Sequence, residues 1–305
     1  MADDRLDIST PLVRALIADQ FPQWVDLHIA PLVPGGWNNR SFRLGEAMSV
    51  RMPSAERYAA QVEKEQTTLP KLAPHLPLPI TKAIAMGKPG RGYPFPFGIY
   101  GWIEGETAKR DRIHDMGRFA LDLAQFLNAL RAINASDGIP AGAHNFFRGG
   151  DLAVYEAEAR AALALLGEHL DQNLLTEILD LALSSRWQHP PVWVHGDIAW
   201  GNLLVRDGQL AAVIDFGSCG TGDPACDLAI AWTLFDGESR AVFRKALGLE
   251  ADVWQRARGW TLWKALIVLA QEQDKTSAVA AEQREVIQAL AEDHVQERDG
   301  AQGRY

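Results

Sequence analysis

A predicted β-hairpin past the middle of this 305-residue chain constrains the fold more than any other feature. Two short apolar runs, Leu203–Arg206 and Leu210–Ile214, flank the sequence Asp207-Gly208-Gln209. An Asp-Gly pair between apolar runs predicts a tight hairpin, because glycine tolerates the positive φ that such turns need. The two strands of a hairpin are antiparallel, so the residue entering the first, Asn202, is expected beside the residue leaving the second, Asp215.

These two side chains and a third form a candidate reaction centre. Asn202 and Asp215 carry oxygen ligands of the type that Mg²⁺ prefers. Asp197 lies five positions before Asn202, in a predicted loop from which its carboxylate can reach the same place. Phosphoryl transfer needs a metal to neutralise phosphate and a carboxylate to orient the incoming hydroxyl. The stretch therefore predicts a magnesium-dependent phosphoryl-transfer centre.

Each of these residues also has an ordinary structural explanation. A lone histidine such as His195 more often holds a loop than acts as a base, and this suits an orienting role. Asn202 fits a strand entry, and Asp215 fits a turn. Asp227 falls in the first turn of a predicted helix, where the helix dipole favours a negative charge, or it braces the loop that contains His195. The combination of H-G-D-x-x-x-x-N, the hairpin and I-D-F-G is far more specific than any single residue.

Composition narrows the partners and the compartment. The net charge of −9 argues against nonspecific binding to nucleic acid or to anionic membranes. Two cysteines without metal-ligand spacing argue against a disulfide framework or a zinc site, and favour a reducing cytosol. The first ten residues lack the apolar run of a secretory signal, and the apolar segment Trp260–Ala270 is too short to span a bilayer and contains Lys264. We expect a cytoplasmic monomer or homodimer without a nucleic-acid or membrane partner.

The remaining pattern divides the chain into a sheet-rich first third and a helical remainder. The expected early elements are helices over 10–20 and 56–72, and strands over 27–32, 41–44, 48–52, 82–86 and 97–103. Later apolar positions recur three or four apart, and predict helices over 115–133, 151–169, 171–186, 225–236, 239–247, 252–271 and 276–296. We therefore expect an α+β chain with an N-terminal lobe (1–98), a hinge (99–104) and a helical C-terminal lobe (105–305), and clefts between unequal lobes commonly bind ligands.

The motifs HGDIAWGN, IDFG and GDPACD, preceded by a sheet-rich lobe, resemble the aminoglycoside phosphotransferase family of small-molecule kinases. The resemblance extends from Gly35-Gly36 to about Trp263. It implies a bilobal protein kinase-like fold, with an antiparallel-sheet lobe that binds nucleotide and a larger helical lobe that carries the catalytic loop and the substrate site. The implied activity is Mg²⁺-dependent transfer of the γ-phosphoryl group of ATP or GTP to a hydroxyl of an aminoglycoside-type antibiotic or a related metabolite. Macrolides, sugars and amino-alcohols are alternative acceptors, and antibiotic resistance is an implied role.

The resemblance also implies a role for each matching residue. Asp197 would accept or orient the hydroxyl proton, and Asn202 and Asp215 would hold Mg²⁺. His195 would position the catalytic loop, and Asp227 would brace it. The loop 35–39 would cover the phosphates, and backbone groups of the segment 99–102 would bind the base. The implied nucleotide-binding residues are Gly35, Gly36, Asn38, Asn39, Arg51, Glu65, Tyr100 and Trp102.

One residue departs from the family pattern. The family usually has a lysine paired with a helix glutamate, but this chain reads MSVRMP and places Arg51 there, with Glu65 as its partner. Arginine keeps the charge and can bind carboxylate and phosphate with two nitrogens, yet its planar group is longer and differently directed. Lys64 is expected to point elsewhere. A non-catalytic nucleotide-binding module is therefore an alternative function. A metal hydrolase is a weaker one, because a second histidine at ligand spacing is missing.

The late region offers an ambiguous sign of the acceptor. Between residues 272 and 299 there are eight acidic and three basic residues. A carboxylate-rich region would suit a polycationic aminoglycoside, but a solvated helix face explains the same pattern. Four tryptophans likewise fit either a substrate wall or the core, and helical spacing favours the core for most of them: Trp232, Trp254, Trp260 and Trp263.

Overall fold

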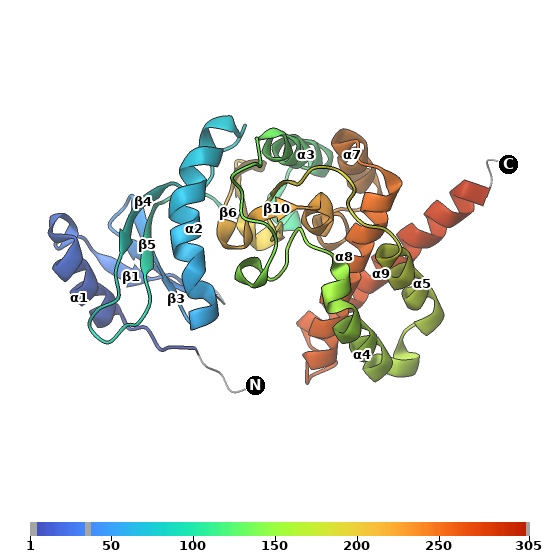
Figure 1. The fold of residues 1–305 in the computed structure, drawn as a ribbon, viewed down its shortest axis with the longest axis horizontal. Helices are drawn as coiled ribbons and strands as arrows, with labels where there is room; N and C mark the ends of the chain where they lie inside the picture. The colour runs from blue at the N-terminus through green and yellow to red at the C-terminus, as the bar shows by residue number, and fades with distance from the viewer. Residues whose placement is uncertain (1–4, 34–37, 303–305) are drawn as a thin grey trace.

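The computed structural model describes residues 5–33 and 38–302, and it divides into a sheet-rich part and a larger helical part (Figure 1). The N-terminal sheet has five antiparallel strands in the order β1-β2-β3-β5-β4. Its strands are β1 (Ile29–Pro31), β2 (Asn39–Leu44), β3 (Met48–Pro53), β4 (Ala83–Gly87) and β5 (Phe97–Gly101). The α+β class with a small antiparallel sheet and a larger helical part is confirmed.

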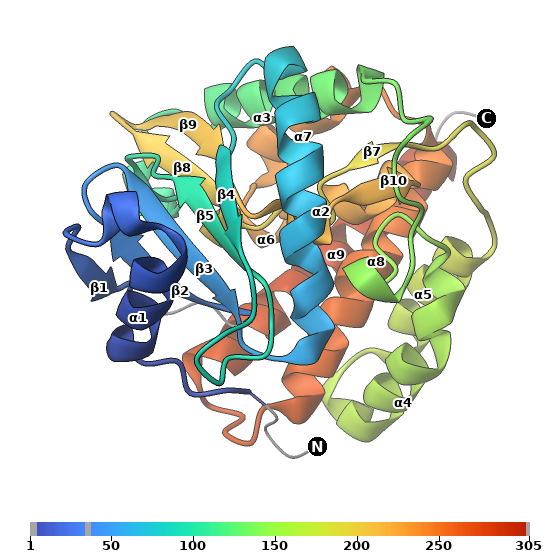
Figure 2. The ribbon, with the colours of Figure 1, turned by 60° about the vertical axis from the view of Figure 1, so that its left-hand side comes forward.

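Two helices accompany this sheet. Helix α1 (Thr10–Gln20) buries Val13, Leu16 and Ile17, and these side chains share one core cluster with apolar residues of the strands. Helix α2 (Glu56–Leu72) lies between the sheet and the helical part in both views (Figures 1 and 2). Both helices have the bounds that the apolar spacing predicts. The position of α2 lets its side chains contact both parts of the molecule.

The helical part begins after β5 and contains two small sheets. One sheet joins β6 (Glu106–Thr107), β8 (Leu203–Arg206) and β9 (Gln209–Val213), and the other joins β7 (Val192–Val194) and β10 (Gly220–Gly222). Its helices are α3 (Met116–Ala132), α4 (Glu156–Leu166), α5 (Gln172–Leu183), α6 (Ile230–Thr233), α7 (Gly237–Leu247), α8 (Ala251–Gln271) and α9 (Ala278–Gln302). The predicted boundary at 99–104 follows the end of β5, and its action as a hinge stays a prediction.

The predicted hairpin is present, and one predicted helix is wrong. Strands β8 and β9 pair antiparallel, and their turn consists of Asp207 and Gly208, with φ of 53° and 74°. Positive φ at both positions is what a two-residue hairpin turn requires. The single helix predicted over 225–236 is instead a 3₁₀ segment, Pro224–Leu228, followed by the short α6. The 3₁₀ segment begins at an Asp-Pro pair, whose side chain and fixed φ suit a helix start.

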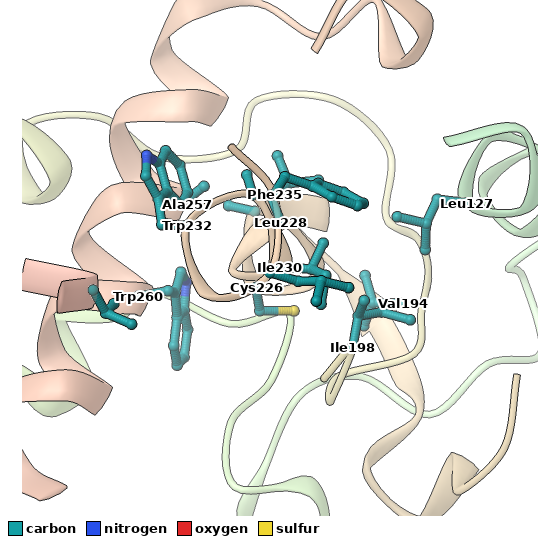
Figure 3. Packing of buried hydrophobic residues seen from close by; sticks show 14 of the residues in the cluster. Leu127, Val194, Ile198, Cys226, Leu228, Ile230, Trp232, Phe235, Ala257 and Trp260 are labelled. Carbon is teal, nitrogen blue, oxygen red and sulfur yellow. The ribbon is translucent and has the colours of Figure 1, made fainter. Parts of the chain in front are cut away.

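The core of the helical part lies between α3, α8 and the segment after β10. Leu127, Val194, Ile230 and Trp260 pack in this cluster (Figure 3). The tryptophans of the late region are all buried, with exposed fractions of 4% for Trp232, 1% for Trp254, 2% for Trp260 and 4% for Trp263. Trp232, Trp254 and Trp260 therefore belong to the core, while Trp263 also lines the cavity described below. Within residues 5–33 and 38–302, no helix is long and apolar enough to cross a bilayer.

A buried lysine joins α2 to the helical part. The Lys64 Nζ atom donates to His144 Nδ1 at 3.2 Å, and His144 Nε2 donates to the Pro140 carbonyl at 2.9 Å. Lys64 thus points away from Arg51, as the sequence predicts. Burial lowers the pKa of Lys64 to about 8. A folded-state pKa below that of free lysine means that the unfolded chain binds more protons between these two pKa values.

Stability is therefore expected to rise with pH as Lys64 loses its proton. Between pH 7.5 and 10, the free energy of unfolding of the parent should increase relative to Lys64→Met by about 1–3 kcal/mol. Urea denaturation of both proteins at the two pH values measures this. Lys71→Met, on the same helix but with a side chain 54% exposed, should show no such change. If the free energies of unfolding of the parent and of Lys64→Met differ by the same amount at both pH values, the lowered pKa of Lys64 is contradicted.

Candidate functional site

A cavity of about 1060 Å³ lies where the N-terminal sheet meets the helical part. Its lining comes from β2, β3 and the segment after β5 on one side, and from the hairpin β8–β9 and helix α8 on the other. The predicted site residues that line it are Asn38, Asn39, Arg51, Trp102, Asp197, Asn202 and Asp215. A volume of this size suits a small-molecule ligand.

The hairpin brings three predicted residues together. The Ile214 N–H donates to the Asn202 carbonyl at 2.9 Å, which places Asp215 next to Asn202. The Asn202 Nδ2 group donates to both the carbonyl and the Oδ2 atom of Asp197, each at 2.9 Å. Asn202 therefore holds one oxygen of Asp197, and its own Oδ1 atom remains an acceptor. The arrangement places two oxygen ligands beside a partly engaged carboxylate.

A buried carboxylate holds the backbone of the Asp197 loop. The N–H groups of His195 and Gly196 donate to Asp227 Oδ2 and Oδ1 at 2.8 and 2.7 Å. The His195 Nε2 group donates to the Ile214 carbonyl at 3.0 Å, and its Nδ1 accepts from the Asp197 N–H at 3.2 Å. Because one ring nitrogen must donate and the other accept, the imidazole is neutral. His195 and Asp227 thus position the loop, and neither lines the cavity.

Replacing Asp227 with asparagine is expected to lower the free energy of unfolding by about 1–3 kcal/mol. Burial raises the pKa of Asp227, yet its two oxygens accept two backbone N–H groups. Asparagine offers one oxygen only, so one buried N–H would oppose an NH₂ group. Chemical denaturation measures the loss. Asp236→Asn is a matched control, because asparagine also caps a helix. Equal stability of the two variants would contradict the bracing role.

Arg51 links the sheet, α2 and the hairpin. Its Nη1 atom lies 3.1 Å from Glu65 Oε1, and its Nη2 atom lies 2.6 Å from Asp215 Oδ1. The predicted Arg51–Glu65 pair is therefore present, and the planar guanidinium adds a contact to Asp215 that joins the two parts of the molecule. Burial alone would raise the pKa of Asp215, but the charge and the hydrogen bond of Arg51, together with His195 and the Gly217 N–H, lower it. Burial raises the pKa of Glu65 in spite of Arg51.

Asp215 also has an unusual backbone conformation. Asp215 has φ 65° and ψ 70°, in the left-handed region that non-glycine residues seldom occupy. Such conformations persist where surrounding contacts hold them, and they cluster at functional sites. The Arg51 contact and the start of a 3₁₀ segment at Phe216 hold Asp215 in this conformation.

Several groups of residues 100–102, at the end of β5 and just after it, are engaged within the protein. Tyr100 is fully buried, and its hydroxyl donates to Glu65 Oε2 at 2.8 Å, so this side chain lies behind the cavity. The N–H groups of Gly101 and Trp102 donate to the Lys82 and Ala47 carbonyls, both at 2.8 Å. A base bound at this edge would need other backbone groups of the segment. Gly35 and Gly36, which were predicted to cover the phosphates, lie outside the described residues.

The donor set fits a magnesium ion. Asn202 and Asp215 supply hard oxygen ligands, and Mg²⁺ usually takes one or two protein ligands together with phosphate oxygens and water. In the described part of the chain, no group of three or more His, Cys, Asp or Glu side chains could hold a metal ion. A metal at this site would therefore depend on phosphate for further ligands.

Most residues that line the cavity on the acceptor side of Asp197 were not predicted from the sequence. Arg148, Tyr155, Glu158 and Lys264 line it beyond Asp197, together with Phe146, Trp263 and Ile267. These residues come from the 137–150 segment, the start of α4 and helix α8. One signal was visible, because Lys264 is a lone charge in the apolar run 260–270.

Comparisons with known proteins place the chain in a protein family. A family model described as the phosphotransferase enzyme family matches residues 30–260. No curated protein matches the chain.

Solved structures with similar folds span nearly the whole chain. The GDP and kanamycin complex of APH(2")-IIia matches with 21% identity and a TM-score of 0.71, covering 93% of this chain and 98% of that one. The streptomycin–ATP–APH(2")-IIa ternary complex matches with 17% identity and a TM-score of 0.59, covering 94% and 98%. The macrolide 2'-phosphotransferase MphH from Brachybacterium faecium, an apoenzyme, matches with 22% identity and a TM-score of 0.56, covering 92% and 97%. These likenesses confirm the bilobal α+β fold.

Proposed function

The chain belongs to the phosphotransferase enzyme family, and from this premise we propose that it transfers the γ-phosphoryl group of ATP or GTP to a hydroxyl of a small molecule. The observation that carries the proposal is the contact between Asp197 and Asn202 beside Asp215, in a cavity large enough for a nucleotide phosphate tail and an acceptor. Solved neighbours with the same fold are complexes of GDP and of ATP, so both nucleotides are kept.

The side chains divide the work of this reaction. Asp197 accepts the proton of the acceptor hydroxyl, and Asn202 holds one of its oxygens so that the other faces the reacting group. Asn202 and Asp215 are the ligands we assign to Mg²⁺, which would neutralise phosphate charge when bound. Arg51 holds Asp215 and lines the cavity, where it can contact phosphate. Little covalent chemistry falls to the protein, since positioning and charge stabilisation dominate phosphoryl transfer.

Aminoglycosides and macrolides are the first acceptors to test, because the names of the fold neighbours include kanamycin, streptomycin and a macrolide phosphotransferase. Each acceptor would be incubated with ATP or GTP and Mg²⁺ beside an analogue that lacks the hydroxyl, and release of ADP or GDP would be measured. The proposal predicts nucleotide turnover that depends on an acceptor hydroxyl and on Mg²⁺. Nucleotide binding without turnover across a broad hydroxyl panel would favour the non-catalytic module instead.

A further inference from the structure

The half of the cavity beyond Asp197 carries two positive side chains. Arg148 follows the 3₁₀ segment Ala143–Asn145, and Lys264 projects from α8, and both line the cavity together with Asp197. An acceptor that presents its hydroxyl to Asp197 must lie in this half, because the nucleotide side is formed by the sheet and the segment after β5.

Neither positive side chain is held in an ion pair, although the carboxylates of Asp197 and Glu158 lie near Lys264. Among the residues that the structure describes, no carboxylate forms an ion pair with Arg148 or Lys264. The Arg148 guanidinium instead lies over aromatic rings, 5.1 Å from the Trp260 centroid and 5.0 Å from the Trp263 centroid. The one additional acidic residue in this half, Glu158, accepts a hydrogen bond from Trp263 Nε1 at 2.8 Å.

The two cations also act on each other. Burial and then the nearby Arg148 charge lower the pKa of Lys264, while Asp197 and Glu158 act in the opposite direction. Arg148 is half-buried and Lys264 is exposed, so both side chains can stay charged and can meet an anion that enters the cavity. A bound carboxylate or phosphate would engage guanidinium and ammonium donors directly.

The acidic late region does not lie in the cavity. None of its eight acidic residues lines it. Asp293 contacts Arg258 at 3.1 Å, and Glu297 forms ion pairs with Arg244 and Arg258. These two carboxylates hold α9 against α7 and α8. In the described part of the chain, the acidic side chains on this side of the cavity are therefore Asp197 and Glu158, which are few for a polycationic acceptor.

An aromatic wall completes this half. Tyr155 and Trp263 stack with ring centroids 3.8 Å apart and an interplanar angle of 17°. The Tyr155 hydroxyl is fixed by donation to the Phe146 carbonyl at 3.0 Å. Ile267 adds a further apolar side chain to the lining. The wall is rigid and apolar, and it suits a flat or hydrocarbon portion of a ligand.

We infer that the acceptor is an anionic hydroxy compound, whose carboxylate or phosphate group lies against Lys264 and Arg148 and whose apolar portion lies along Tyr155 and Trp263. This inference rests on the proposed function, because it assigns the acceptor of that same site. Phosphoryl transfer then joins the γ-phosphorus to the acceptor oxygen, breaks the bond to the nucleotide diphosphate, and leaves the hydroxyl proton on Asp197.

The test uses sets of aromatic hydroxy compounds that share one scaffold and hydroxyl. Within a set, the members carry a carboxylate, a phosphate monoester, a neutral primary amide or a cationic aminomethyl group. Calorimetric binding and phosphoryl transfer from ATP and GTP with Mg²⁺ are measured on the full chain. The carboxylate and phosphate arms identify which anion the site prefers. We expect an anionic member to bind at least about tenfold more tightly than its amide, the size of one charge-assisted contact.

Variants of Lys264 link the preference to the site. Because Arg148 remains in the cavity, Lys264→Gln should reduce the anion-to-amide ratio by at least about threefold, part of one charge-assisted contact, and Lys264→Arg should retain most of it. Lys245→Gln changes an exposed residue of α7. It serves as the control and should leave the ratio unchanged. Melting temperatures of all variants verify folding, and Arg148→Gln, which removes the other cation and carries the same expected reduction, replaces Lys264→Gln if that variant does not fold.

The outcomes separate this inference from the proposed function. Tighter binding of the amide or aminomethyl member, an anion-to-amide ratio that is unchanged in Lys264→Gln, or no binding of any anionic member overturns the inference. Transfer to a neutral or cationic acceptor in preference to its anionic partner also overturns it, while supporting the proposed function. Binding of an anionic member that depends on Lys264, without transfer from either nucleotide, supports the anion site and contradicts the proposed function.

Discussion

Asp197→Asn is expected to lower kcat by about 10²–10⁴-fold, the usual contribution of a general base. Asparagine keeps the size of the side chain but cannot accept the hydroxyl proton. The KM for nucleotide should change little, because Asp197 lies on the acceptor side of Asn202. Only one oxygen of its side chain contacts Asn202. Steady-state kinetics with any acceptor found in the panel measures both constants.

Asp207→Asn provides the matched control for this prediction. Asp207 is exposed in the turn of the same hairpin, and asparagine tolerates its positive φ. The control should keep the parent kcat. If Asp197→Asn turns over at the parent rate, or if both variants lose activity alike, Asp197 is not the proton acceptor.

Arg51→Met is expected to lower the free energy of unfolding by about 3–5 kcal/mol, because it removes the partner of two carboxylates in a largely buried cluster. Glu65 has a side chain only 4% exposed, and Asp215 one 33% exposed. Methionine fills the space of the arginine stem but leaves these charges facing each other across the cavity edge. Urea denaturation measures the loss, and the KM for nucleotide should rise in parallel as the Asp215 position relaxes.

Arg160→Met is the matched control for the Arg51 variant. Arg160 also contacts two carboxylates, Glu156 at 2.9 Å and Asp180 at 2.6 Å, but its side chain is 40% exposed. Solvent screening should limit that loss to about 1 kcal/mol or less. A similar cost for the two variants would show that the Arg51 contacts behave as a surface pair.

The parts of the site that the sequence predicts are those determined over short distances. A hairpin with an Asp-Gly turn sets the register of its strands, and so determines that Asn202 and Asp215 are neighbours. The Arg51–Glu65 pair crosses from a strand to the next helix and was predicted through the family resemblance. The contact of Arg51 with Asp215 was not, because it depends on how α2 and the sheet pack on the hairpin.

The acceptor side shows why the rest was not predictable. Arg148 and Lys264 are more than a hundred residues apart, and no periodic pattern relates a loop after α3 to the middle of α8. Composition left two explanations for the late acidic residues, and the structure agrees with the solvated helix face, because most of them are exposed and none lines the cavity. Asp293 and Glu297 pair with arginines of α7 and α8. The predicted helix over 225–236 was wrong at a local scale, because its first turn is a 3₁₀ segment and α6 covers only Ile230–Thr233.

The most direct test of the central claim is mass spectrometry of the acceptor after incubation with Mg²⁺ and ATP or GTP labelled with ¹⁸O on the γ-phosphate. We expect an acceptor that gains one labelled phosphoryl group on its hydroxyl, with the parent protein and not with Asp197→Asn. Label released only as inorganic phosphate, or equal labelling by the parent and Asp197→Asn, would contradict a phosphoryl-transfer centre built on Asp197, Asn202 and Asp215.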